Sequence, residues 1–225
     1  MLIQSSIPNH QIVNPFMRLL FLILLVFNSS CFAQADWVLA KDKDGIKVFL
    51  RNYKNGRLKE FKATTTCKAT LPQLLSVFQD VENSKSWMAD IKKSTLLKSI
   101  SGSDCYKYFE ISVPFPLKNR DVIYHEKIKQ EHNKAVHIIL KSVSDYSEDK
   151  HGLVRMTESE GLWTFQPKGG GDIEITYQLY ADPEGIPSWV VNLLMVDGPL
   201  LTLKNLKEEV KKDAYQHKKF AFIKE

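Results

Sequence analysis

Hydrophobic and polar residues alternate along most of the chain beyond residue 45, which is the pattern of half-buried β-strands. Short turns rich in Gly, Asn and Ser separate these runs, which favours hairpin connections within one long antiparallel sheet. The expected strands span residues 46–53, 58–68, 94–100, 105–113, 121–130, 135–143, 153–160, 161–166 and 172–181.

Two segments instead have the period of amphipathic helices. In the first, Thr70 and Gln73 have the spacing of a capping box and Pro72 falls in the first turn, which predicts a helix that begins at residue 71. A second, short helix is expected at residues 83–87.

The C-terminal segment predicts a longer helix that starts at Pro187-Ser188 and is kinked at Gly198-Pro199. One face of this helix is apolar and the opposite face carries lysines, so the helix must lie across the sheet to bury its apolar face. The apolar face consists of Leu200, Leu203, Leu206, Val210 and Ala214, and the lysines are Lys204, Lys207, Lys211 and Lys212.

These elements predict an α+β fold in which a curved antiparallel sheet is wrapped around the long C-terminal helix. Where curvature keeps the helix from filling the concave face, apolar side chains enclose an internal hydrophobic cavity, and such a cavity favours an apolar guest. The chain has 225 residues, 44% of them hydrophobic and 25% charged, as in globular proteins. No repeat or low-complexity linker follows residue 36, so residues 36–225 are expected to form one domain.

The first 35 residues have the features of a cleaved signal peptide. They contain no Asp or Glu, and the apolar run at residues 19–27 is nine residues long, too short for a bilayer crossing of about 20. Ala33-Gln34-Ala35 then provides a small-residue cleavage site. We therefore expect an exported protein, periplasmic or secreted, with a bacterial source favoured. Lipidation at Cys31 and a retained anchor are less favoured alternatives, and translation can start at Met1 or Met17.

Two pairs of residues leave structural alternatives open. Cys67 and Cys105 form a disulfide or remain free thiols. Arg120 and Asp121 are expected to form an ion pair or a turn at a strand entrance rather than a ligand contact. The formal net charge of +5 suits weak contact with anionic lipid but is too diffuse to indicate nucleic-acid binding, and a monomer is expected.

Sequence motifs for catalysis and metal binding are missing. The chain has no Gly-x-Ser-x-Gly elbow, no His-Glu-x-x-His and no Gly-rich phosphate loop that leads into a helix. The histidines beyond residue 35 show no metal-ligand spacing. We therefore predict a protein that is not an enzyme and that uses no metal or other cofactor.

Several short segments occur in a distinctive order and spacing. The strongest are VPFPLKNRDVIY at residues 113–124 and GIPSWVVN at residues 185–192. Together with Asp36-Trp37, Trp87 and the segments at 45–48, 60–63 and 152–155, they resemble a START (StAR-related lipid-transfer) domain over nearly all of residues 36–220. The resemblance implies a helix-grip fold, no catalytic cofactor, and a tunnel for one lipid or sterol beneath the C-terminal helix.

The head-group residues of known members do not carry over. In phosphatidylcholine-transfer members an Arg and an Asp hold the phosphate, whereas Ser84 and Met88 stand at those positions here. The aromatic cage for choline keeps one aromatic residue, Phe109, so the cation–π site is incomplete. Glu126 replaces the cavity Arg of sterol-type members.

Period-two spacing predicts which side chains face the cavity. Phe109 and Ile111 share a face of one strand, and Val122, Tyr124 and Glu126 share a face of the next. If these faces are concave, Tyr124 and Glu126 can orient a ligand hydroxyl or amine; alternatively, Glu126 is a surface charge paired with a Lys. The predicted lipid-binding residues are Trp87, Phe109, Ile111, Val122, Tyr124, Glu126, Trp163, Tyr177, Trp189 and Asn192.

We therefore predict a protein that holds one lipid, sterol or other hydrophobic ligand in an internal tunnel and exchanges it during transient contact of the C-terminal helix with a membrane. The helix or its Gly198-Pro199 bend is expected to open the tunnel. Two other functions fit the same scaffold: a cyclase/aromatase-like enzyme, and an interaction module of the cell envelope that binds no ligand.

Overall fold

The computed structural model describes residues 36–54, 56 and 58–224. Three predictions concern residues outside this part of the chain: the signal peptide, the alternative lipidation site at Cys31 and the two candidate start residues. Within it, no helix is long and apolar enough to cross a membrane.

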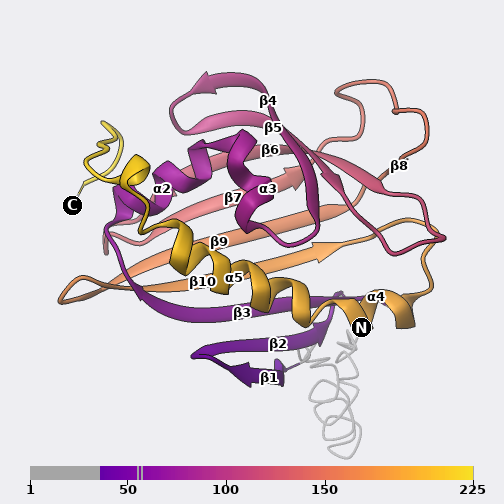
Figure 1. The fold of residues 1–225 in the computed structure, drawn as a ribbon, viewed down its shortest axis with the longest axis horizontal. Coiled ribbons are helices and arrows are strands. Elements are labelled where there is room, and N and C mark those ends of the chain that lie inside the picture. The colour runs from indigo at the N-terminus through magenta and orange to yellow at the C-terminus, as the bar shows by residue number, and fades with distance from the viewer. Residues whose placement is uncertain (1–35, 55, 57, 225) are drawn as a thin grey trace, which may run out of the picture. The chain divides into compact units, whose positions relative to one another are not determined.

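A ten-stranded sheet dominates the described part of the chain (Figure 1). The strand order is β1-β2-β3-β10-β9-β7-β6-β5-β4, with β8 beside β6. Because the last strand, β10, pairs with β3, it joins the strands of the two halves of the chain into one surface. The strands are β1 (Val38–Lys43), β2 (Ile46–Asn52), β3 (Lys59–Lys68), β4 (Ile91–Ser101), β5 (Asp104–Ile111), β6 (Arg120–Gln130), β7 (Val136–Ser142), β8 (Val154–Arg155), β9 (Ser159–Gly169) and β10 (Asp172–Ala181).

Apart from shifts of one to three residues at strand ends, the observed strands differ from the expected ones at two places. The run at 153–160 is not one strand: only Val154–Arg155 pairs, parallel to β6, and β9 already begins at Ser159. Alternation of residue types does not mark where ladder hydrogen bonds end, which is why the sequence pattern missed this break. The pattern also does not predict β1, whose residues are mostly exposed on both faces and do not alternate.

The first helical region matches its prediction. The side-chain oxygen of Thr70 accepts a hydrogen bond from the backbone N–H of Gln73, and the backbone N–H of Thr70 donates to the side chain of Gln73, so the capping box is confirmed. This box opens α2 (Leu71–Gln79), which is followed by η1 (Val81–Asn83) and α3 (Ser84–Trp87). These elements and the C-terminal helices lie on the same face of the sheet (Figure 1).

The C-terminal helical region is divided into α4 (Ser188–Leu194) and α5 (Asp197–Glu209), followed by η2 (Asp213–Tyr215). The break lies at residues 195–196, so the predicted kink at Gly198-Pro199 is wrong by three residues. Gly198 and Pro199 instead lie in the first turn of α5. Proline is tolerated there because first-turn N–H groups have no partner within the helix.

Helix α5 lies across the sheet, against β2 and β3 and beside α3 (Figure 1). Leu203, Leu206 and Val210 are fully buried, as the stripe predicts. Ala214 is exposed, because the α-helix ends at Glu209 and the period does not continue into η2.

Aromatic side chains join the helices to the sheet. Phe78 of α2 packs edge-on against Trp163 and Phe165 of β9, and Trp87 of α3 packs against both Phe78 and Trp163. Large aromatic rings supply much of the area that such a core buries. Of the two alternatives for the cysteines, the structure has free thiols.

Candidate functional site

A mostly apolar cavity of about 180 Å³ lies between the inner face of the sheet and the helices. Strands β3, β5, β6, β7 and β10 supply one wall, and residues 84–91 with the first turns of α5 supply the other. Ligand pockets in proteins have volumes of about 300–1,000 Å³, so this space is small for a lipid.

Seven of the ten predicted lipid-binding residues line the cavity. They come from α3 and from three strands, and the period-two faces of β5 and β6 both point inward, as expected. The seven are Trp87, Phe109, Ile111, Val122, Tyr124, Glu126 and Tyr177.

The other three predicted residues lie outside the cavity wall. Trp163 is fully buried and stacks on Tyr177, with ring centroids 3.8 Å apart, so it supports the wall from behind. Trp189 on α4 is 72% exposed. Asn192, also on α4, accepts a hydrogen bond from the backbone N–H of Lys59. The spacing of the α4 segment does not reveal which of its faces meets the sheet.

Lys107 and Glu126 form an ion pair in the wall. Nζ of Lys107 lies 2.6 Å from Oε1 of Glu126, and both side chains are 4% exposed. Nζ also donates to the carbonyl of Phe78 at 2.9 Å. The alternative prediction for Glu126 was a surface charge paired with a Lys. The Lys partner is confirmed, but the pair is buried and does not lie on the surface. Lys107 is not among the residues predicted from the sequence, although it precedes Phe109 by two residues and therefore shares its strand face.

Two tyrosine side chains also reach the cavity. The hydroxyl of Tyr124 lies 2.6 Å from Oγ of Ser159, which in turn donates to the carbonyl of Tyr180. Burial raises the pKa of Tyr124 to about 12, and burial, with a smaller effect of Tyr124, raises the pKa of Tyr177. Both phenols are therefore neutral at physiological pH, and that of Tyr124 is hydrogen-bonded to Ser159.

Arg120 and Asp121 are structural, but they do not pair with each other. Asp121 receives two hydrogen bonds of 3.0 Å from the guanidinium of Arg155. Arg120 donates to the carbonyls of Lys118, Pro183 and Glu184. The prediction of a structural role is confirmed by these contacts, and the predicted pairing of neighbours is wrong, because adjacent residues of a strand point to opposite faces.

The first turn of α5 and the segment after α3 form one side of the cavity. A Cβ added at Gly198 would lie 3.8 Å from Oδ2 of Asp90, an ordinary van der Waals contact, so the side chain of Asp90 lies beside Gly198. Both residues line the cavity. Asp197 beside them is held by Lys41 in an exposed ion pair, which contributes little stability.

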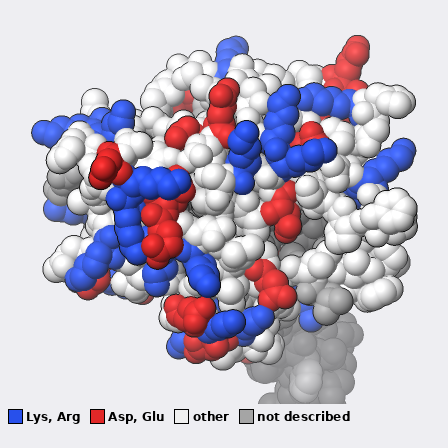
Figure 2. Space-filling view, viewed as in Figure 1, with Lys and Arg blue, Asp and Glu red and all other residues white. Residues whose placement is uncertain are grey.

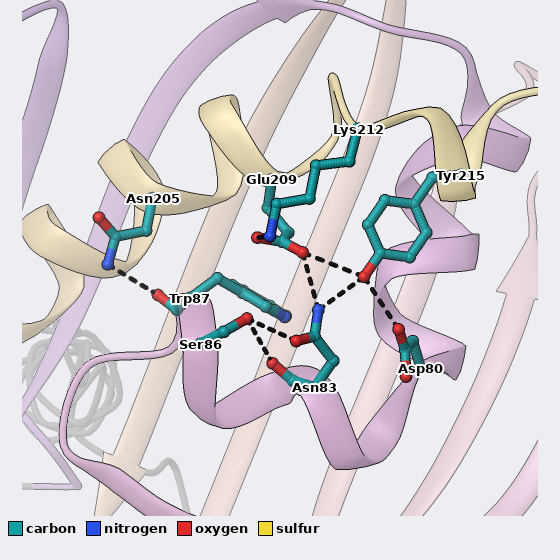
Figure 3. A network of polar contacts seen from close by, with 8 residues as sticks. All are labelled: Asp80, Asn83, Ser86, Trp87, Asn205, Glu209, Lys212 and Tyr215. Carbon is teal, nitrogen blue, oxygen red and sulfur yellow. Dashed lines mark hydrogen bonds and ion pairs between the residues drawn. The ribbon is translucent and has the colours of Figure 1, made fainter.

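The other end of α5 is bound by a polar network in which Glu209 and Tyr215 are buried (Figure 3). Nδ2 of Asn83 donates to Oε1 of Glu209 and to the hydroxyl of Tyr215, each at 2.7 Å. That hydroxyl lies 3.0 Å from both Oδ2 of Asp80 and Oε1 of Glu209, and Lys212 pairs with Glu209. Burial alone would raise the pKa of Glu209, but the hydrogen bonds from Lys212, Asn83 and Tyr215 outweigh burial and hold its pKa below the usual value. We call these five residues the latch.

Two further hydrogen bonds continue the attachment along α5. Nδ2 of Asn205 donates to the carbonyl of Trp87, as Figure 3 also shows, and the hydroxyl of Thr202 accepts from the backbone N–H of Ala89. The attachment of α5 therefore strengthens from its first turn toward its last.

Basic and acidic side chains are interleaved on the face that carries α5 (Figure 2). Lys211 pairs with Glu208 and Lys212 pairs with Glu209, so two of the four lysines of the predicted basic face are partly neutralised. Lys204 and Lys207 take part in no ion pair among the described residues.

Metal binding finds no support in this geometry. Within the described ranges, no group of three or more His, Cys, Asp or Glu side chains is placed to hold a metal ion. The half-buried thiol of Cys105 has a pKa raised to about 11, chiefly by burial, so it is protonated at neutral pH and a poor nucleophile.

Comparison with known proteins gives consistent matches. The family model described as START domain matches residues 25–214. An uncharacterized protein of Pseudomonas aeruginosa is 36% identical over 198 residues, 87% of this chain and 98% of that protein. The phosphatidylcholine transfer protein of Rattus norvegicus is 28% identical over 192 residues, 82% of this chain and 87% of that protein.

A solved structure matches as well. The crystal structure of a STAR-related lipid transfer protein fragment from Xanthomonas axonopodis superposes with a TM-score of 0.74 at 36% identity, and the match covers 78% of this chain and 99% of that one.

Proposed function

Because this chain belongs to the START domain family, we propose that it binds one lipid in the cavity beneath α5 and carries it between membranes. The observation that carries the proposal is the mostly apolar cavity between sheet and helices, which Asp90 and Gly198 line at the edge formed by the first turn of α5. The relatives named for phosphatidylcholine transfer and lipid transfer support it.

The transfer free energies of an acyl chain favour reversible binding and release of a lipid. Burying about 16 methylene groups of an acyl chain stabilises the complex by about 13 kcal/mol, at about 0.8 kcal/mol each. Leaving a membrane costs nearly the same amount. The net change is small, so a lipid can exchange between the cavity and a bilayer without a chemical step, and we propose a protein that is not an enzyme.

Loading requires the cavity to expand. The present volume of about 180 Å³ is below that of ordinary ligand pockets. The first turn of α5 is the part of the lid with the weakest polar attachment, since an exposed ion pair holds Asp197 while the latch holds the opposite end through the buried side chains of Glu209 and Tyr215. We therefore propose that α5 opens at Gly198 and Pro199.

Membrane contact is proposed at the end of the molecule that carries α4. Trp189 is 72% exposed and Phe115, in the loop between β5 and β6, is 96% exposed. Arg120 ties that loop to the loop before α4 through the carbonyls of Pro183 and Glu184. Exposed aromatic side chains of this kind are suited to a membrane interface. Export to the periplasm or outside the cell, with removal of residues 1–35, belongs to the same proposal.

Extraction tests the binding function. Purified protein is examined by native mass spectrometry and then extracted with organic solvent. A co-purifying lipid at about one per chain is the expected result. Protein that carries no lipid, even after incubation with vesicles, would count against the proposal.

A cross-link tests the opening. Asp90→Cys and Gly198→Cys, in a chain that also carries Cys67→Ala and Cys105→Ser, are joined by a short thiol-reactive linker. We expect vesicle-to-vesicle lipid transfer to stop when the linker is added and to continue in the unlinked protein. The Gly198→Cys chain alone, treated with the same reagent, is the control. Unchanged transfer by the linked protein would reject the opening at α5.

A further inference from the structure

Gly161 lies in the interior of β9, on the strand face that it shares with Trp163 and that points toward the helices. It pairs with Leu140 of β7 on one side and with Leu179 of β10 on the other, and neither ladder shifts its register there. A glycine inside a strand weakens the strand and often marks a bulge or a close approach to its backbone. The regular pairing excludes a bulge, and the φ angle of Gly161 lies outside the left-handed region that favours glycine. The reason for the glycine therefore lies in the space above the strand.

Two leucine side chains occupy that space. A Cβ added at Gly161 would lie 3.1 Å from Cδ1 of Leu140 and 3.1 Å from Cδ1 of Leu179, which is closer than nine in ten real Cβ contacts. Both leucines line the cavity between sheet and helices. A side chain at residue 161 would push them away from the sheet and therefore into the cavity. Gly161 thus lets its two neighbours lie low on the sheet and keeps the space above them open.

The glycine belongs to an apolar row that crosses the strands. From β7 to β3, the paired residues of this row are Leu140, Gly161, Leu179 and Phe61. The two leucines and Phe61 line the cavity. Because neighbouring strands are about 4.8 Å apart, the row is about 14 Å long. A floor of this length without polar side chains suits an extended acyl chain.

Stability alone would favour alanine at residue 161. Glycine loses more conformational freedom on folding than alanine, so it destabilises a strand relative to alanine. The two shortest contacts of an added Cβ are with the flexible ends of side chains that face a cavity, and the third, 3.3 Å from Cβ of Leu140, requires a shift of a few tenths of an ångström. The leucines can make this shift because they border empty space. The volume of the cavity, by contrast, favours glycine.

We propose, on the basis of the lipid-binding function above, that Gly161 sets the size of the acyl chain that the cavity accepts. The chain of the bound lipid lies across the strands on the row that runs from Leu140 over Gly161 and Leu179 to Phe61. The cavity of about 180 Å³ is already small for a lipid, so each atom added at residue 161 removes space that a long chain needs more than a short one. Gly161 is therefore a specificity-determining residue for chain length, whatever the head group of the lipid.

The test measures which chain lengths the protein binds. The purified full chain is incubated with vesicles of phosphatidylcholine, phosphatidylethanolamine and phosphatidylglycerol with a minor amount of diacylglycerol. Within each of these classes, myristoleoyl, palmitoleoyl, oleoyl and eicosenoyl chains are present in equal amounts. The protein is re-isolated and extracted, and mass spectrometry gives the ratio of oleoyl to myristoleoyl lipid within each class that is bound.

We expect Gly161→Val to lower this ratio about tenfold, since overpacking by a side chain of this size lowers a binding constant by at least about that factor. Gly161→Ala should lower the ratio in the same direction by a smaller factor. The melting temperature of Gly161→Ala should equal or exceed that of the wild type, because alanine suits the strand and the leucines can yield.

A compensating variant separates cavity volume from strand packing. Leu179→Ala removes one of the two leucines over Gly161, so Gly161→Val with Leu179→Ala should recover most of the wild-type ratio, which a purely structural role of the glycine does not predict. Leu179→Ala alone should shift the bound lipids toward eicosenoyl chains. Gly102→Ala adds a methyl group beside Phe222, at the turn between β4 and β5 and outside the cavity, and should keep the wild-type ratio. Circular dichroism confirms the folding of each variant.

The possible failures are distinguishable. An unchanged ratio in Gly161→Val, no recovery in the compensated variant, or a marked fall in the melting temperature of Gly161→Ala overturns the role of Gly161 in chain selection while lipid binding stands. Recovery of no acyl lipid from the wild type overturns this inference, and it overturns the proposed function as well where the protein also purifies without any lipid. Leu179→Ala keeps Gly161 in place, so an unchanged chain distribution in that variant overturns the inference even if no variant of residue 161 folds.

Discussion

Glu209→Gln tests whether the latch holds the C-terminal end of α5. The carboxyl of Glu209 is 5% exposed and receives hydrogen bonds from Asn83 and Tyr215, while its third partner, Lys212, is 56% exposed. A hydrogen bond to a charged group contributes about 1.5–3 kcal/mol and one between neutral groups about 0.5–1.5. Neutralising the acceptor of the two buried bonds should therefore lower the free energy of unfolding by about 2 kcal/mol. The half-exposed ion pair adds little.

The direction of the pKa shift of Glu209 determines how its contribution to stability changes with pH. The pKa of Glu209 in the folded protein is below its usual value, so the carboxylate stabilises the fold above about pH 4.3, and that stability is lost as the pH falls through the folded pKa. The difference between wild type and Glu209→Gln is thus expected in full at pH 7 and should shrink toward pH 3. Urea unfolding followed by circular dichroism at both pH values measures it.

Glu208→Gln is the matched control. Glu208 is the neighbouring residue, is 70% exposed and pairs with the exposed Lys211, so no measurable loss of stability is expected. The reasoning is refuted if the two variants behave alike at pH 7, or if the effect of Glu209→Gln is the same at both pH values.

Three further outcomes are expected. Thr70→Ala removes the side-chain acceptor of the α2 capping box and should cost about 1 kcal/mol in thermal or urea unfolding, whereas Thr70→Ser should cost much less. Lys107→Met alone leaves the carboxylate of Glu126 buried without its partner and should cost about 3–5 kcal/mol, more than the double replacement with Glu126→Leu; a double variant less stable than the single one would refute this. Phe115→Ser and Trp189→Ser should each weaken co-sedimentation with vesicles about tenfold without changing the melting temperature, since both side chains are exposed; unchanged sedimentation would remove this end from membrane contact.

Local chemistry is what the sequence predicts well. The capping box depends on residues three apart, so Thr70 and Gln73 could be assigned without knowledge of the tertiary fold. Alternation within β6 placed Glu126 on the same strand face as Tyr124 but left open whether that face is the inner one. The apolar face of the C-terminal helix predicted that this helix lies across the sheet, and the resemblance to a family implied the same arrangement.

Contacts between distant segments were not predictable in this way. Asp121 pairs with Arg155, 34 positions away, because a short parallel contact between β6 and β8 brings them together, and no periodicity encodes that contact. Lys107 was missed for a different reason: a lysine in a strand is ordinarily solvated, and only the cover of Phe78 and Glu126 makes its burial tolerable. Trp189 was placed in the cavity on residue type, whereas the orientation of α4 exposes it.

The latch, the small cavity and the polar pair fit one mechanical scheme. A space of about 180 Å³ cannot admit a whole lipid without movement, and movement is least costly where attachment is weakest. Among the contacts of α5, an exposed ion pair holds Asp197 and a buried hydrogen bond joins Glu209 to Tyr215, so the proposed opening of α5 would turn about its C-terminal end while the Lys107–Glu126 pair stays in the sheet. A helix released at both ends would lose this pivot, which the buried contact between Glu209 and Tyr215 supplies.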